Sequence, residues 1–281
     1  MNFRARLQAA EERNQSLLCI GLDPEPSRLP GDWRGDPSRI FEFCAAIVDA
    51  TADLAIAFKP QIAHFAACAA EAQLERLIGH IRRVAPSVPV ILDAKRGDIG
   101  STAELYAREA FERYGADAVT LSPYLGFDSI EPYLRWPDKG LILLCRTSNP
   151  GAAELQGQRL ANGELLFEQV ARLAAGPWNA SGQIGLVVGA TWPAELARVR
   201  ELAPTLPLLV PGVGAQGGDA AAVVRAAWGV EAPVAVNSSR AILYAGAGSD
   251  FAEAARAAAE VTRAQLQSAK AGVQAGTSGG V

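Results

Sequence analysis

The sequence has no excess of basic residues and no long apolar run, and each absence excludes a class of protein. Lysine and arginine total 26 against 30 aspartate and glutamate residues, so the net charge is -4. Such a chain offers no electrostatic footprint for nucleic acid or an anionic membrane. No stretch approaches the ~20 apolar residues of a membrane span, and the polar start MNFRARLQAAEERNQS lacks the apolar core of a secretory signal. We therefore expect a cytoplasmic protein, and any small anionic ligand would need locally concentrated positive charge.

Histidine and cysteine are also scarce. Only two histidines occur, and the four cysteines, Cys19, Cys44, Cys68 and Cys145, lie far apart among apolar neighbours. They form no CxxC pair and no metal-binding spacing with histidine, so we expect reduced core residues. No Ser-His-Asp set, metal triad or cofactor-binding lysine motif occurs either.

Apolar residues make up 49% of the chain, and many of them fall in eight short runs separated by helix-like segments. Runs that are apolar on both faces are typical of parallel strands covered by helices. Eight such units over roughly 250 residues predict an α/β fold, a single (β/α)8 TIM barrel, with a doubly wound open sheet as the alternative. The runs are SLLCIGLD, LAIAFK, VPVILDAK, ADAVTLS, GLILLCRTS, IGLVVGAT, LPLLVPGVG and PVAVNSS.

Local patterns place further elements. Ser101 and Glu104 have the spacing of a capping box, and Gly115 follows TAELYAREAFERY as a stop, which predicts a helix between them. The segment from 24 to 39 is rich in proline, glycine and charge, so we expect a long surface loop that borders the site. We expect one catalytic domain over residues 1–270 and a disordered tail at 271–281, because QAGTSGGV is small and polar.

Polar side chains follow the ends of several runs, where the active site of a parallel barrel lies. Any one of them could be an ordinary solvated or capping residue, but their joint occurrence predicts a site. They include Asp23, Lys59, Asp93, Lys95, Ser148 and Arg240.

The stretch ILDAKRGDIGST concentrates charge at the end of the third run. Asp93 and Lys95 are two positions apart on a strand, so their side chains leave the same face. If that face is the barrel interior, they meet Lys59 in a partly desolvated pocket where alternating signs compensate one another. The alternative is a salt-bridge network that supports the barrel without doing chemistry.

The stretch VPGVGAQGGD carries Gly212, Gly214 and Gly217 in a G-x-G-x-x-G spacing. A dinucleotide-binding fingerprint would also need an acid about 20 residues further on, and PVAVNSSRA offers none. With Arg240 just beyond the eighth run, the glycines instead fit the phosphate site that barrels build from their last two loops. Ordinary turn geometry is the alternative.

Together, Lys59, DAKRGDI, TSNPG, PGVGAQGGD and the final Ser-Arg pair resemble the orotidine 5'-phosphate decarboxylase family, in its divergent bacterial type 2 branch. The resemblance spans Ser16 to Tyr244. It implies a carboxy-lyase that converts orotidine 5'-phosphate to UMP and carbon dioxide, the last step of de novo UMP biosynthesis. It also implies no metal, no organic cofactor, and a homodimer with shared active sites.

The same resemblance assigns roles to individual residues. It makes Lys95 the proton donor, Asp93 the carboxylate facing the substrate carboxylate, and Lys59 the partner lysine. Asp98 would reach the active site of the other subunit. The implied substrate contacts are Asp23 to the ribose, Ile99 and Thr102 at the shared site, Ser148 to the pyrimidine, and Gly214, Gln216, Ser239 and Arg240 around the phosphate. Many family members have glycine in place of Ser239, so a different backbone is expected there.

Two alternatives to this function stay open from the sequence. A metal-assisted sugar-phosphate decarboxylase or aldolase of the same barrel type would need acidic magnesium ligands at the strand ends. A non-catalytic nucleotide-binding barrel would keep the phosphate loop but would not need both Lys59 and Lys95 facing acids.

Overall fold

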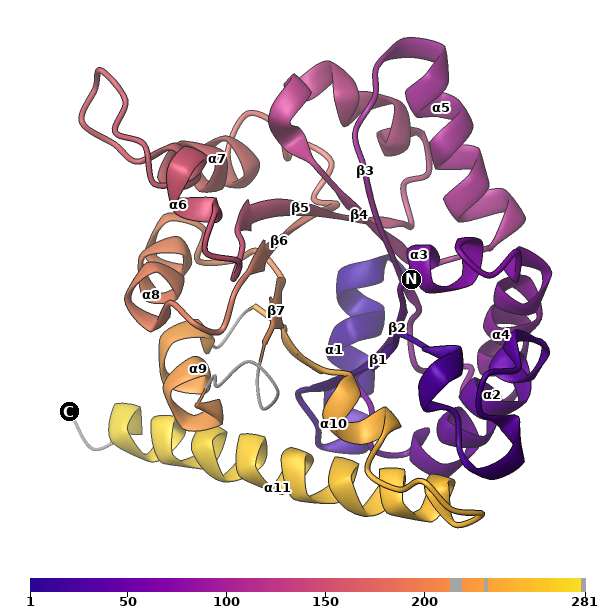
Figure 1. Cartoon of the computed structure of the whole chain (residues 1–281). Helices are drawn as coiled ribbons and strands as arrows, with labels where there is room; N and C mark the ends of the chain where they lie inside the picture. The colour runs from indigo at the N-terminus through magenta and orange to yellow at the C-terminus, as the bar shows by residue number, and fades with distance from the viewer. Residues whose placement is uncertain (213–218, 230–231, 279–281) are drawn as a thin grey trace.

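The computed structural model describes residues 1–212, 219–229 and 232–278, and its centre is a ring of eight parallel strands (Figure 1). The strands run in the order β2-β1-β8-β7-β6-β5-β4-β3, and parallel bridges from Phe58 to Val90 and from Gln61 to Asp93 join β2 to β3. The predicted (β/α)8 barrel is therefore confirmed, and the open sheet is excluded. The strands are β1 Leu18–Leu22, β2 Ala57–Pro60, β3 Ile91–Arg96, β4 Ala118–Leu121, β5 Gly140–Arg146, β6 Ile184–Val188, β7 Leu208–Pro211 and β8 Val234–Ser238.

Helices surround the strands, as Figure 1 shows, and each crossover returns the chain to the start of the next parallel strand. Between β4 and β5 the crossover consists of three 3-10 helices, η5 Pro123–Leu125, η6 Phe127–Ser129 and η7 Glu131–Arg135. The α-helices are α1 Phe3–Asn14, α2 Ile40–Thr51, α3 Ile62–Ala66, α4 Glu71–Val84, α5 Gly100–Arg108, α6 Ala152–Leu155, α7 Leu166–Ala175, α8 Pro193–Leu202, α9 Ala220–Ala227, α10 Arg240–Leu243 and α11 Phe251–Ser278. No helix in these described ranges is both long and apolar enough to cross a membrane.

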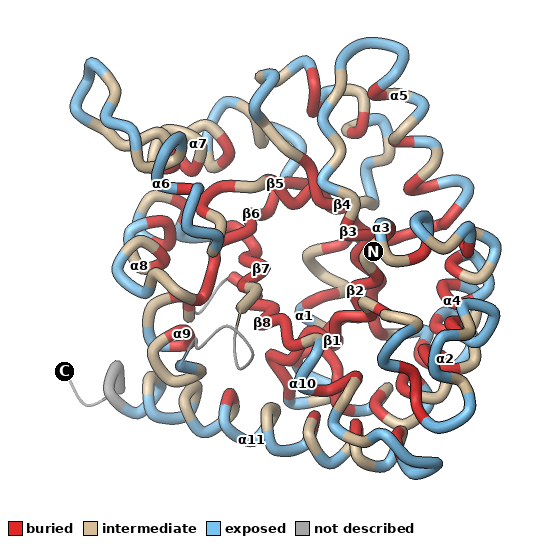
Figure 2. Tube along the Cα trace, in the orientation of Figure 1, coloured by how far each residue is buried: buried red, intermediate tan, exposed pale blue. Residues whose placement is uncertain are grey.

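Two apolar layers hold the barrel together, and the strands between them are buried (Figure 2). Alternate residues of each strand face opposite layers: Ile142 packs in the barrel interior, whereas Leu141 and Leu143 pack against the helices. Helix α1 contributes Phe3 and Leu7 to the inner layer. The inner layer is thus filled by apolar side chains, and the polar residues of the barrel gather at the carboxyl ends of its strands.

The helix after β3 begins differently from the prediction. Its first residue is Gly100 and its N-cap is Ile99, which makes no side-chain capping bond. Ser101 therefore lies inside the first turn, and the predicted capping box with Glu104 is wrong. The predicted stop is confirmed, because a π-helical turn carries the helix to Arg113 and Gly115 follows with φ +66°.

The last helix also differs from the prediction. Helix α11 continues to Ser278, through the expected boundary at 270, so residues 271–278 are helical rather than disordered. Ala269 and Val273 pack against the core, and the helix lies along α9 and α2. The small, polar composition of the tail did not indicate this helix, which continues from the packed turns that precede it.

The segment from 24 to 39 is a loop with three 3-10 turns, η1 Pro26–Arg28, η2 Gly31–Trp33 and η3 Pro37–Arg39. Tyr244 anchors its start, because the Tyr244 hydroxyl accepts the backbone N–H of Glu25 at 2.7 Å and donates to the carbonyl of Asp23 at 3.2 Å. The loop therefore leaves the barrel directly beside Asp23, as expected for a segment that borders the site.

Candidate active site

The charged residues predicted from the third run meet at the carboxyl ends of β2 and β3. Asp93 accepts hydrogen bonds from Lys59 Nζ on Oδ2 at 2.9 Å and from Lys95 Nζ on Oδ1 at 2.6 Å. Asp93 and Lys59 are buried, whereas the Lys95 side chain is 45% exposed. One carboxylate thus joins a buried ammonium to one that faces the barrel mouth.

Burial and charge act in opposite directions on this cluster. Burial alone would raise the pKa of Asp93, but the ammonium groups of Lys59 and Lys95 outweigh it and hold that pKa well below its usual range. Burial alone would lower the pKa of Lys59, but Asp93 and Asp23 outweigh it and raise the pKa. The acid and its buried lysine therefore stay charged together at neutral pH.

The β3 backbone is irregular where it presents Lys95. Leu92 pairs with Val119 and Arg96 pairs with Leu121, so the β3 strand carries two extra residues between these pairs. Within this bulge Lys95 has φ +45°, a left-handed conformation that is uncommon for a residue with a side chain. Bulges beside active sites commonly redirect a side chain, and this one brings the Lys95 ammonium back to Asp93.

Thr120 of β4 fills the bulge and was not predicted as a site residue. Its Oγ1 accepts the backbone N–H groups of Ala94 and Lys95, each at 3.0 Å, and donates to Asp93 Oδ1 at 2.8 Å. A single hydroxyl inside an apolar run was the only sequence signal for it.

Asp23 and Ser239 lie together beside Lys59. The Ser239 hydroxyl donates to Asp23 Oδ2 at 2.6 Å, and Asp23 Oδ1 lies 4.0 Å from Lys59 Nζ. Within the described chain, Oδ1 of Asp23 is buried without a hydrogen-bond partner. Ser239 has φ -123°, so its side chain is accommodated without the left-handed conformation that would favour glycine.

A cavity of about 520 Å³ opens beside this cluster. Ser148, in the loop after β5, also lines this cavity and packs closely against Gly189. Gln156 holds this loop by accepting the backbone N–H of Thr147 at 2.8 Å, another contact that the sequence did not indicate. The cavity is lined by charged, hydroxyl and apolar side chains, including Lys59, Asp93, Lys95, Thr120, Leu144 and Leu209.

The predicted phosphate contacts are only partly placed. Arg240 is exposed and forms the first residue of α10, directly after Ser239. Gly214 and Gln216 lie outside the described residues. Gly212, which precedes them, has φ +106°, a conformation suited to glycine.

Three predicted residues lie outside the charged cluster. Asp98 accepts the backbone N–H of Ile99 at 2.8 Å, and Ile99 is 52% exposed. Thr102 is exposed on α5. In the described chain none of the three pairs with Lys59 or Lys95.

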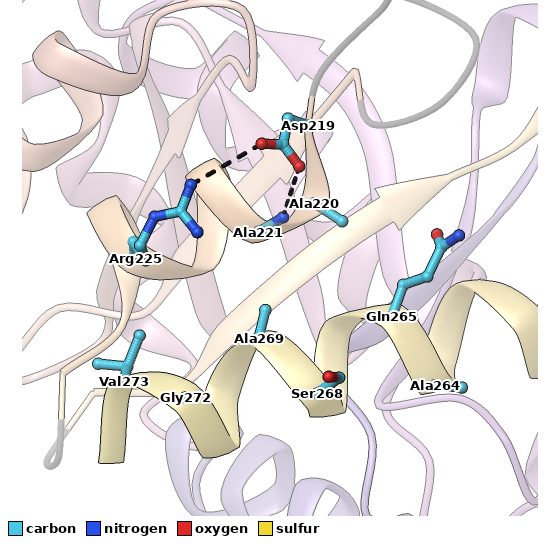
Figure 3. A pocket seen from close by; sticks show the side chains of 10 residues that line it. All are labelled: Asp219, Ala220, Ala221, Arg225, Ala264, Gln265, Ser268, Ala269, Gly272 and Val273. Carbon is cyan, nitrogen blue, oxygen red and sulfur yellow. Dashed lines mark hydrogen bonds and ion pairs between the residues drawn. The ribbon is translucent and has the colours of Figure 1, made fainter. Parts of the chain in front are cut away.

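Another hollow, of about 980 Å³, lies between α9 and α11 on the outside of the barrel (Figure 3). Its lining is mostly small, with Ala269 and Gly272 of α11 facing the ion pair between Asp219, the N-cap of α9, and Arg225 within α9. It contains none of the predicted site residues. Among the described residues there is also no group of three or more histidine, cysteine, aspartate and glutamate side chains that could hold a metal.

The fold and the cavity define an α/β-barrel protein in which alternating charges gather at the carboxyl ends of β1 to β3. A family model described as "Orotidine 5'-phosphate decarboxylase / HUMPS family" matches residues 16–258. The chain belongs to this family.

Individual relatives agree with the family match. The chain is 70% identical over 278 residues to the orotidine 5'-phosphate decarboxylase of Methylibium petroleiphilum. The match covers 96% of this chain and 100% of that protein. The solved OMP decarboxylase of Leishmania donovani is 39% identical, with a TM-score of 0.83 and coverage of 96% and 99%. The UMP synthase of the same organism is 41% identical, with a TM-score of 0.85, and the match covers 96% of this chain but 56% of that one.

Proposed function

We propose that the chain is a carboxy-lyase that converts orotidine 5'-phosphate to UMP and carbon dioxide, the last step of UMP biosynthesis. The observation that carries this proposal is the Asp93 carboxylate held between Lys59 and Lys95 at the mouth of the cavity. The names of relatives up to 70% identical over almost the whole chain support the same substrate. We also propose a cytoplasmic location, as the sequence predicts.

Lys95 is the proposed source of charge stabilisation and of the proton. Departure of carbon dioxide leaves a carbanion on the pyrimidine ring, which has no conjugated electron sink, so the protein must stabilise that charge electrostatically. The Lys95 ammonium is partly exposed toward the cavity and held 2.6 Å from Asp93. It can attract the carbanion and then donate a proton to it.

Asp93 is proposed to act on the substrate carboxylate. Its pKa lies below the usual range, so it is ionised at neutral pH. Two like charges ~4 Å apart at an effective dielectric of ~20 repel by about 4 kcal/mol, and this repulsion disappears when carbon dioxide leaves. Binding energy from the distant phosphate can offset that repulsion in the ground state.

The remaining proposed contacts lie beside the charged cluster, on the wall of the cavity and at the start of α10. Asp23 has one buried oxygen without a protein partner, which suits a ribose hydroxyl donor. Ser148 on the cavity wall is proposed to contact the pyrimidine. Arg240 and Ser239, with Gly214 and Gln216, are proposed to bind the phosphate, for which a guanidinium offers bidentate donors.

We also propose a homodimer in which Asp98, Ile99 and Thr102 complete the site of the partner. Apolar side chains close to these residues in the chain are exposed: Ile99 itself is 52% exposed, and Leu105, three residues after Thr102 on α5, is 61% exposed. Large exposed apolar side chains are typical of an interaction surface.

The alternative function is that of a metal-assisted sugar-phosphate enzyme of the same fold. Its metal would require several acidic ligands at the strand ends, and Asp93 is already committed to two lysines. The lysine-rich set therefore favours metal-free decarboxylation.

Turnover by the purified chain in excess chelator tests the proposal. Orotidine 5'-phosphate is mixed with the protein, loss of the orotate-ring absorbance is followed, and UMP is identified in the product. We expect prompt conversion that is unchanged by the chelator. No conversion, with turnover of a sugar phosphate only after magnesium is added, would overturn the proposal in favour of the rival. Tight UMP binding without any turnover would instead indicate a nucleotide-binding barrel.

A further inference from the structure

We infer that Thr120 is a positioning residue for decarboxylation, because it holds the β3 bulge that aims Lys95 and fixes the orientation of Asp93. The inference deepens the proposed function and rests on it for the role of Lys95.

The hydroxyl of Thr120 is saturated by contacts with the catalytic cluster. A hydroxyl has one proton to donate and two lone pairs to accept with. Thr120 Oγ1 accepts two backbone N–H groups, those of Ala94 and Lys95, and donates to Asp93 Oδ1. All three of its hydrogen bonds are therefore made to three consecutive residues of β3.

The bulge needs such a partner because it interrupts the strand ladder. Between the Leu92–Val119 and Arg96–Leu121 pairs, the β3 backbone cannot follow the regular pairing with β4. Ordered pairing resumes where the Ser122 N–H reaches the Arg96 carbonyl at 2.7 Å. Thr120 supplies a side-chain acceptor to the two N–H groups inside the gap, which would otherwise lose their ladder partners.

The same contact stabilises the unusual backbone of Lys95. A left-handed conformation at a residue with a side chain persists only where its surroundings hold it. The Lys95 N–H bond to Thr120 is one such restraint, and the 2.6 Å ion pair to Asp93 is the other.

Thr120 also sets the rotation of the Asp93 carboxylate. Its donated proton and the Lys95 ammonium both bind Oδ1, which leaves Oδ2 for Lys59. Loss of the hydroxyl would free the carboxylate to rotate and the lysine to move. A displacement of about 1 Å at a reacting group can lower a rate by about 100-fold.

Three variants separate this role from ordinary packing. Thr120→Val keeps the shape of the side chain and removes the hydroxyl, whereas Thr120→Ser keeps the hydroxyl. Thr51→Val is the matched control, since Thr51 is also buried and its hydroxyl donates to the Ile47 carbonyl at 2.6 Å in α2. Thr120→Ala replaces the valine variant if that variant does not fold.

Two measurements are made on each variant: kcat and KM for orotidine 5'-phosphate, and amide hydrogen exchange of the free protein. We expect Thr120→Val to lower kcat by about 30-fold or more with KM changed less than about threefold, because the phosphate contacts are untouched. Thr120→Ser should restore kcat to within about fivefold of the parent, and Thr51→Val should leave it unchanged. Amide exchange at Ala94 and Lys95 should accelerate in the valine variant alone.

A folded Thr120→Val protein with parental kcat and parental exchange would overturn the inference. So would a serine variant as slow as the valine variant, because the hydroxyl would then not be the operative group. The exchange measurement needs no turnover. An inactive parent with the predicted exchange pattern would therefore overturn the proposed function while leaving the bulge contact established.

Discussion

Lys59 and Lys95 bind opposite oxygens of one carboxylate, at 2.9 and 2.6 Å from Asp93. The two lysines differ in surroundings, because the Lys59 side chain is 5% exposed and that of Lys95 is 45% exposed. Lys59 therefore serves to neutralise Asp93 inside the barrel, while Lys95 remains available to a ligand in the cavity.

Removal of the buried lysine should destabilise the fold. Lys59→Met leaves Asp93 buried with one ammonium fewer, and breaking a buried pair costs about 3 to 5 kcal/mol. We expect the free energy of unfolding, measured in urea, to fall by an amount near the lower end of this range, because Lys95 still pairs with Asp93. Arg108→Met is the matched control, since it breaks the exposed pair with Glu112 and should change stability by less than about 0.5 kcal/mol. Equal effects of the two substitutions would contradict the assignment.

The charges of Asp93 and Lys59 should also make the stability of the fold depend on pH. The pKa of Asp93 is lower in the folded state than in the unfolded chain, where it is about 4. The ionised carboxylate therefore contributes to the free energy of unfolding above about pH 4, and this contribution is lost as the pH falls toward the folded-state pKa. Lys59 has a raised pKa, so its contribution is lost only above about pH 10.4, as pH rises through the folded value. Urea midpoints of the parent and of Asp93→Asn should therefore converge below about pH 4. A gap that stays constant down to pH 2 would argue against an ionised Asp93.

Much of this arrangement could be predicted from the sequence, because it depends on how often apolar runs recur and on which polar residues follow them. Eight apolar runs gave the eight strands, and their polar ends predicted that Asp93 and Lys95 lie beside Lys59, although Lys95 reaches Asp93 through a bulge rather than through regular strand alternation. The bulge could not be predicted in this way, since Thr120 meets β3 only through the β3–β4 register. Local motifs were less reliable: the spacing of Ser101 and Glu104 predicted an N-cap at Ser101, whereas the N-cap is Ile99, two residues earlier.

Arg240 should recognise the phosphate rather than the nucleoside. Arg240→Ala removes charge-assisted hydrogen bonds, so we expect UMP to bind about 10- to 100-fold more weakly by calorimetry. Uridine lacks the phosphate and provides the control, with affinity changed less than about threefold. Equal losses for UMP and uridine would place Arg240 elsewhere in the site.

Complementation between inactive variants tests whether Asp98 crosses to the partner. Asp98→Ala and Lys95→Ala proteins are unfolded, mixed and refolded together. Random pairing should give mixed dimers in which one of the two sites has both native residues, so total activity should reach about a quarter of the parent value. If Asp98 serves its own subunit, each mixed dimer carries one defect in each site. The mixture would then be no more active than the variants alone.

The measurement that tests the central claim most directly is the single-turnover rate of Lys95→Ala with orotidine 5'-phosphate, beside its affinity for UMP. If Lys95 stabilises and protonates the carbanion, the rate should fall by about 1,000-fold or more while UMP affinity changes less than about 10-fold. A variant that still decarboxylates within about 10-fold of the parent rate would contradict the account, because the charge that carries the chemistry would then lie elsewhere.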